Sequence, residues 1–114
     1  MTTTADVTEV TDGNFAEEVL GSELPVLVEF TADWCPPCRQ MAPVLRALAA
    51  EEAGRMRIAQ LDVDHHPRTT NAYKVLSMPT FMLFRGGEPV CSLVGARPKR
   101  RLLAELEDAL RPSR

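Results

Sequence analysis

The sequence has no long hydrophobic run, although 45% of its 114 residues are hydrophobic. Its apolar stretches are much shorter than the roughly 20 residues that a membrane-spanning helix requires, so we expect no membrane partner. The segment 1–6 has neither a basic start nor an apolar core and therefore does not fit a secretory signal. A chain whose leader had been removed would look the same, so this segment alone does not settle the location.

The sequence also has little net charge and few cysteines. The formal net charge is only -3 at pH 7, which gives no electrostatic reason to expect binding to nucleic acid. The three cysteines are an odd number, which argues against the disulfide framework of a small secreted domain. We therefore expect a cytoplasmic protein. The chain has no internal repeat, and its length fits one domain covering residues 1–114.

The pattern of apolar residues predicts alternating strands and helices. Strands are expected at residues 7–10, 25–30, 56–63, 80–84 and 90–94, with a two-residue turn at Gly86-Gly87 before the last of them. Helices are expected after an N-cap at Thr11 or Asp12, after Cys35, at residues 67–73 and from about Pro98 onward. This order indicates an α/β domain with a mixed sheet and helices on both faces.

Two cysteines separated by two prolines follow the apolar run 25–31, in the segment Trp-Cys-Pro-Pro-Cys at 34–38. Cysteines at this spacing can form a disulfide within one turn, and a strand leading into a helix is the usual setting of a redox-active pair. Unpaired N–H groups and the helix dipole at a helix start lower the pKa of a thiol. We therefore expect an exposed Cys35 to be the nucleophile and a more buried Cys38 to be the resolving thiol.

A zinc site is the main alternative for these cysteines. Cys35, Cys38, Cys91 and either His65 or His66 could form a Cys₃His set, but the rigid Pro-Pro turn and the lack of a second Cys-x-x-Cys favour a redox pair, so we expect no metal. Cys91 is expected to be a small core residue, with an intermolecular disulfide or regulatory oxidation as the alternative. The two histidines are expected in a solvated loop.

The chain resembles the thioredoxin family over nearly its whole length. Besides the segment 32–38, the matching pieces are Phe15, Val28-Glu29-Phe30, Ala42-Pro43, Asp62-Val63-Asp64, Met78-Pro79-Thr80, Phe84-Arg85-Gly86-Gly87 and Val94-Gly95-Ala96. The resemblance implies the thioredoxin fold and a cis Met78–Pro79 peptide bond beside the cysteines. It also implies general reduction of the disulfides of client proteins, with recharging by a flavin-containing thioredoxin reductase. We expect a monomer that uses no cofactor beyond its own Cys35–Cys38 disulfide.

The chain departs from the usual family pattern at four positions. Pro36 stands where glycine is usual, Glu29 where a buried aspartate is usual, Thr31 where an aromatic residue is frequent, and Gln60 where a lysine is common. Burial would raise the pKa of Glu29, and we expect its carboxylate to accept the proton of Cys38, directly or through a water. The alternative is a solvated glutamate at a strand end.

Four residues are expected to form a surface on which partner proteins dock. Trp34 would shield the disulfide and line this surface. Met78 and Pro79 would present backbone to an extended partner segment, as in strand addition. Gly95 would leave room for the partner, or would merely permit a tight turn.

Pro36 and Pro37 fill the turn between the two cysteines. The same Pro-Pro form occurs in tryparedoxins and in some thioredoxin-like proteins, so the partners are open. A relay to one peroxidase, a disulfide isomerase of the same fold and a redox-inert binding subunit are the alternatives to general protein-disulfide reduction. The basic cluster at 97–101 (Arg97, Lys99, Arg100 and Arg101) is expected to be a solvated face, with docking of an acidic partner as the alternative.

Overall fold

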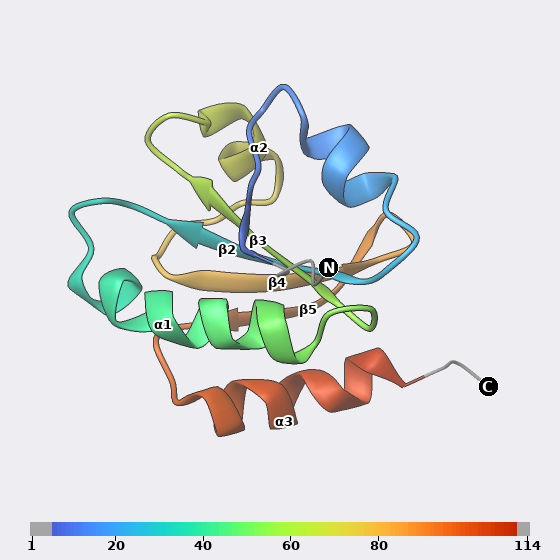
Figure 1. Cartoon of the computed structure of the whole chain (residues 1–114). Coiled ribbons are helices and arrows are strands. Elements are labelled where there is room, and N and C mark those ends of the chain that lie inside the picture. Colours follow the sequence, from blue (N-terminus) through green and yellow to red (C-terminus); the bar gives the residue numbers. More distant parts are fainter. Residues whose placement is uncertain (1–5, 112–114) are drawn as a thin grey trace.

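The computed structural model describes residues 6–111. The segments 1–5 and 112–114 lie outside the described residues. Most of the argument against a secretory signal rests on residues 1–5. The single domain of residues 1–114 therefore stays a prediction. Five strands form one sheet in the order β1-β3-β2-β4-β5 (Figure 1). They are β1 (Thr8–Glu9), β2 (Val26–Thr31), β3 (Arg57–Asp62), β4 (Thr80–Arg85) and β5 (Glu88–Val94).

The sheet is mixed, as the order of elements predicts. Strands β1, β3 and β2 run parallel to one another, whereas β4 is antiparallel to both β2 and β5. The hairpin turn between β4 and β5 has positive φ at both Gly86 (61°) and Gly87 (81°), the backbone that a two-residue turn of this kind requires. Pro89 lies near the start of β5, which is an edge strand, a position at which a proline without an N–H is tolerated.

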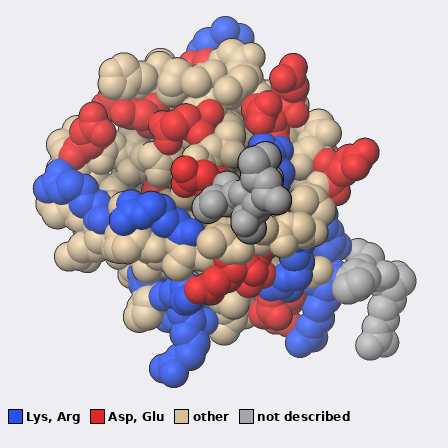
Figure 2. Space-filling model, viewed as in Figure 1, with Lys and Arg blue, Asp and Glu red and all other residues tan. Residues whose placement is uncertain are grey.

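Four helices cover the two faces of the sheet. The helices η1 (Ala16–Leu20) and α2 (Pro67–Ala72) lie on one side, and α1 (Pro36–Glu51) and α3 (Lys99–Leu110) lie on the other (Figure 1). None of the helices within residues 6–111 is both long enough and apolar enough to cross a membrane. Figure 2 shows acidic and basic side chains interspersed over the face in view, with neither sign covering it alone.

Strand β2 is buried on both of its faces. Because side chains alternate along a strand, Val26, Val28 and Phe30 pack into the core with η1, and Leu27 packs into the core with α1 and α3. Glu29 follows Leu27 by two residues, so the same alternation directs its side chain toward α1. The five residues 26–30 are at most 2% exposed, which is why this strand reads as a nearly continuous apolar run.

The first helix differs from the prediction. The chain makes a turn at 12–14 and then a short π-helix, in which the Gly21 N–H donates to the Ala16 carbonyl at 2.9 Å. The N-cap of this helix is Phe15, which makes no side-chain cap, so the predicted cap at Thr11 or Asp12 is wrong; the Thr11 Oγ1 instead accepts a hydrogen bond from the Asn14 N–H at 3.0 Å in the preceding turn. Asp12 instead accepts hydrogen bonds from backbone N–H groups at the start of α2, including that of Thr69 at 2.8 Å.

Candidate active site

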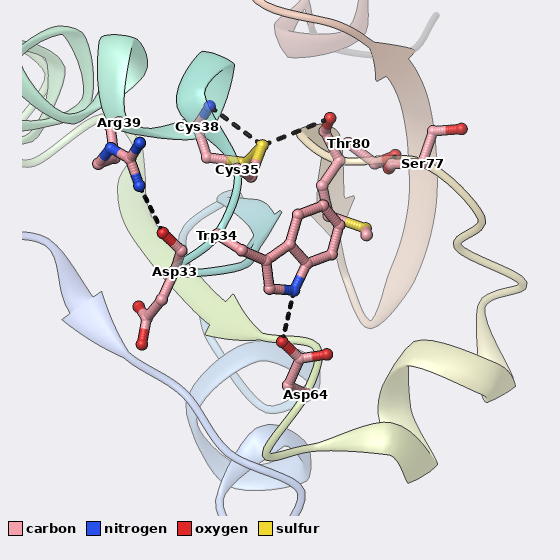
Figure 3. Close-up of a disulfide and its surroundings, with 9 residues drawn as sticks. Asp33, Trp34, Cys35, Cys38, Arg39, Asp64, Ser77 and Thr80 are labelled. Atoms are coloured by element: carbon pink, nitrogen blue, oxygen red, sulfur yellow. Dashed lines mark hydrogen bonds between the residues drawn. A yellow bond between two sulfur atoms is a disulfide. The ribbon is translucent and has the colours of Figure 1, made fainter.

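Cys35 and Cys38 form a disulfide at the start of α1, immediately after the carboxyl end of β2 (Figure 3). Their Cα atoms are 5.3 Å apart. Cys35 is the N-cap of α1, and Pro36 and Pro37 occupy the first helical positions, where a backbone N–H has no partner within the helix. The strand, turn and helix predicted from the sequence therefore position the pair.

The prediction that Cys35 is exposed is wrong. Cys35 is 3% exposed and Cys38 is 4% exposed. The oxidised Cys35 Sγ is bonded to Cys38 and lies 3.7 Å from the carbonyl oxygen of Met78, which belongs to the loop before β4. Because that loop closes over the sulfur, exposure does not distinguish the two cysteines in the oxidised protein.

The two sulfur atoms differ instead in their electrostatic surroundings. The Cys38 N–H donates a hydrogen bond to the Cys35 Sγ at 3.2 Å (Figure 3). Cys35 is thus the sulfur to which the free N–H groups and the positive end of the α1 dipole are directed, and both stabilise a thiolate. The Cys38 sulfur belongs to a residue within the first turn of the helix and has no corresponding N–H donor among the described residues.

Glu29 lies in the interior behind the disulfide. It is 2% exposed, and its Oε2 atom has no hydrogen-bond partner among the described residues. Burial raises the pKa of this carboxyl to about 8, because a charge is poorly solvated there. Glu29 is therefore mostly protonated at pH 7, and the alternative of a solvated strand-end glutamate is wrong.

A cavity of about 180 Å³ connects Glu29 with Cys38. Thr31, Arg39 and Gln60 also line it, and Gln60 is the register partner of Glu29 on β3. A cavity of this size with polar walls has room for water. Thr31 and Gln60, two of the residues at which the sequence was expected to depart from the family pattern, therefore line the same cavity as the buried Glu29 carboxyl.

Trp34 is an exposed side chain beside the disulfide. It is 62% exposed, and its Nε1–H donates to the Asp64 Oδ2 at 2.8 Å (Figure 3). Arg39 is fixed nearby by a hydrogen bond from its Nη1 to the Asp33 carbonyl at 2.6 Å. The sequence indicated Asp64 only as part of the family resemblance, and it gave no indication of a role for Arg39, because both contacts depend on how the segments meet in space.

The predicted cis Met78–Pro79 bond is confirmed. The Gly95 N–H donates to the Pro79 carbonyl at 2.9 Å, so the end of β5 is tied to the loop before β4. Met78 is half-buried and Pro79 is buried. The structure therefore brings Trp34, Met78, Pro79 and Gly95 to the same end of the sheet as the disulfide.

The structure does not assemble the alternative zinc site. Within residues 6–111 no group of three or more His, Cys, Asp or Glu side chains could hold a metal ion. Cys91 packs against the core shared with α1 and α3, and burial raises the pKa of its thiol, as expected for a core-like cysteine. His66 is not simply solvated, since its Nδ1 accepts a hydrogen bond from the Asp12 N–H at 3.2 Å.

A disulfide at a helix N-terminus, next to a cis-proline loop and an exposed tryptophan, defines a protein that exchanges dithiols and disulfides. A model of the thioredoxin family matches residues 6–108 of the chain. The thioredoxin of Mycobacterium tuberculosis is 49% identical over 102 residues, which cover 90% of this chain and 88% of that protein. The thioredoxin of Mycolicibacterium smegmatis is 50% identical over 103 residues, which cover 89% and 92%.

A third relative is longer than this chain. The bifunctional thioredoxin reductase/thioredoxin of Mycobacterium leprae is 47% identical over 102 residues, which cover 90% of this chain but 22% of that protein.

The chain belongs to the thioredoxin family. It is a thiol–disulfide oxidoreductase that reduces protein disulfides with a redox-active cysteine pair, which excludes the redox-inert alternative.

The raised pKa of Glu29 predicts how stability depends on pH. The folded protein holds this proton up to about pH 8, whereas the carboxyl of the unfolded chain loses it at about pH 4.3. The fold therefore loses stability as pH rises from the lower of these values through the higher one, and the loss is complete once pH is well above 8. Glu29→Gln cannot ionise. From pH 5 to pH 9 the variant should gain on the order of 4 kcal/mol of unfolding free energy relative to the parent.

Urea unfolding of the oxidised proteins at both pH values measures this difference. Glu23→Gln, at an exposed position without a hydrogen-bond partner among residues 6–111, is the matched control and should show no such gain. A constant difference between parent and Glu29→Gln across this pH range would show that Glu29 titrates at an ordinary pKa.

Proposed function

We propose that Cys35 is the attacking thiolate of a Cys-Pro-Pro-Cys active site and that Cys38 resolves the intermediate. The observation that carries this assignment is the 3.2 Å hydrogen bond from the Cys38 N–H to the Cys35 Sγ. In the reduced protein the same N–H, at the positive end of α1, would stabilise a thiolate on Cys35. Pro36 and Pro37 hold the intervening turn and donate no competing hydrogen bond.

The proposed reaction transfers two electrons to the client. The Cys35 thiolate attacks one sulfur of the client disulfide, forming a mixed disulfide and releasing the first client thiolate. Cys38 then loses its proton and attacks the Cys35 sulfur. This step releases the second client thiolate and closes the Cys35–Cys38 disulfide, so that the client is reduced and this protein is oxidised. No cofactor other than this disulfide is needed.

Glu29, in its ionised form, is the proposed acceptor of the Cys38 proton. It shares the 180 Å³ cavity with Cys38, it has an oxygen without a hydrogen-bond partner among the described residues, and its pKa of about 8 lies close to that of an ordinary thiol, roughly 8.5. Near-equal pKa values allow a proton to pass in either direction at little cost. The transfer would occur directly or through a water in the cavity.

The proposed docking groove consists of Trp34, Met78, Pro79 and Gly95. Trp34 offers an exposed aromatic face, and the loop at Met78 and Pro79 passes within 3.7 Å of the Cys35 sulfur. A client segment lying along this groove would bring its disulfide to Cys35. We further propose that the protein acts as a monomer in the cytoplasm, a location consistent with its odd cysteine count.

A thioredoxin reductase is the proposed source of electrons. The Mycobacterium leprae relative carries both names, thioredoxin reductase and thioredoxin, in one protein. In this chain the same exchange would run in reverse, with the reductase supplying the dithiol that opens the Cys35–Cys38 disulfide. Client proteins with accessible disulfides would then accept the electrons.

Trapping experiments test the roles of the two cysteines. Cys38→Ser should accumulate mixed disulfides with client proteins, because nothing remains to attack the Cys35 sulfur, and Cys35→Ser should not. Both variants are made with Cys91→Ala, so that the third thiol forms no adduct. Nonreducing gels of reduced variant mixed with a disulfide-bonded client count the adducts. Equal trapping by the two variants would show that the roles are assigned wrongly.

Insulin reduction tests the partner. With a thioredoxin reductase and its electron donor, the protein should reduce many equivalents of insulin, whereas without the reductase the reduced protein should stop after one equivalent. The Cys35→Ser/Cys38→Ser double variant is the blank. If dithiothreitol supports turnover and the thioredoxin reductase does not, another reductant serves this protein.

A further inference from the structure

Arg97 does not belong to the solvated basic face that the sequence predicts. Its side chain is only 7% exposed, in the loop between β5 and α3. The guanidinium donates three hydrogen bonds: from Nη1 to the Glu105 Oε1 at 2.6 Å, from Nη2 to the Val94 carbonyl at 2.6 Å, and from Nε to the Gly95 carbonyl at 3.2 Å. Arg97 thus joins α3 to two successive peptide groups at the end of β5.

The residues held by Arg97 lead directly to the disulfide. Gly95, whose carbonyl accepts from Arg97, donates its own N–H to the Pro79 carbonyl at 2.9 Å. The adjacent Met78 carbonyl lies 3.7 Å from the Cys35 Sγ. An unbroken series of short contacts therefore runs from Glu105 on α3, through Arg97 and Gly95, to the loop that covers the attacking sulfur.

The Gly95 turn needs such a support. Gly95 has φ of 104°, a conformation open to glycine but rarely adopted by other residues, and it has no side chain with which to fix its own position. The arginine fork is suited to this task because its five N–H groups point in fixed, divergent directions. A lysine ammonium could pair with Glu105 but could not hold both carbonyls in the same geometry.

We propose that Arg97, oriented by Glu105, is a positioning residue that sets the shape of the docking groove. By fixing the carbonyls of Val94 and Gly95, it holds the Gly95 turn against Pro79 and keeps the groove ready for an extended client segment. This inference rests on the proposed docking groove. It also predicts that Arg97 acts on the binding of protein clients and leaves the chemistry of the two sulfur atoms unchanged.

Two kinds of substrate separate these effects. Insulin uses the groove, whereas a small aromatic disulfide such as dithionitrobenzoic acid reaches Cys35 without lying along it. With dithiothreitol as the electron source, Arg97→Met should raise the KM for insulin roughly three- to tenfold, because two carbonyls lose a charged donor. Its kcat for insulin should stay within about twofold of the parent, and so should its rate with the small disulfide, measured in a single turnover of the pre-reduced protein without dithiothreitol.

Arg100→Met is the matched control. Arg100 lies three residues further on, is exposed and has no ion-pair or hydrogen-bond partner among residues 6–111, so its substitution removes the same charge without touching the turn. It should leave both rates unchanged. If Arg97→Met does not fold, Arg97→Lys carries the test, since it keeps the pairing with Glu105 and should still raise the KM for insulin.

Trp34→Ala distinguishes failure of this inference from failure of the groove itself. If Trp34→Ala raises the KM for insulin and the Arg97 variants do not, the positioning role of Arg97 is refuted, whereas the proposal that clients bind in the docking groove is supported. If none of these variants changes that KM, both are refuted. An equal loss of rate on insulin and on the small disulfide would also overturn the inference, because it would assign Arg97 to general stability or to the chemistry.

Discussion

The constraint on which this structure depends is an ionisable side chain in a strand that is buried on both faces. Strand β2 needs apolar residues to hold the sheet between two layers of helices, and Glu29 interrupts them. Among the described residues no cation forms an ion pair with its carboxyl, and desolvation alone raises its pKa to about 8. The strand tolerates the group because it is protonated, and a neutral acid is much cheaper to bury than a carboxylate.

The same strand also determines where the chemistry occurs. β2 ends at Thr31 and leads into Cys35, while β4 begins at Thr80, directly after the cis-proline loop, and β5 ends at Val94, directly before Gly95. Since β4 is antiparallel to its two neighbours, these three strand ends meet at one edge of the sheet. A buried acid, a helix N-terminus and two backbone loops therefore converge there.

Much of this arrangement could be predicted from the sequence because it depends on local patterns. Hydrophobic periodicity gave the order of strands and helices, Gly86-Gly87 gave the hairpin, and the spacing of Cys35 and Cys38 gave the disulfide-forming turn. The family resemblance supplied the cis Met78–Pro79 bond. The position of Glu29 within an apolar run was enough to suggest burial and a raised pKa, because such a run is typical of a strand that is buried on both faces.

The rest depends on contacts between segments far apart in the chain. Cys35 was expected to be exposed, but the Met78 carbonyl lies over its sulfur, and no local pattern at 34–38 indicates that loop. Arg97 looked like one of four solvated cations, yet Glu105, eight residues away, and the carbonyls of Val94 and Gly95 hold it in the interior. From the sequence alone a charged side chain is predicted to be exposed, because charged residues are rarely buried without a partner and the partner is not visible in the sequence.

The most direct test of the account is the pH dependence of the step in which Cys38 closes the disulfide. Trp34 is the only tryptophan and lies beside the disulfide, so its fluorescence can follow a single turnover at saturating client. The parent rate should rise as Glu29 ionises, with a midpoint near pH 8, and Glu29→Gln should be slower above that pH and lose this component. Superimposable profiles of the two proteins would contradict the assignment of Glu29 as the proton acceptor.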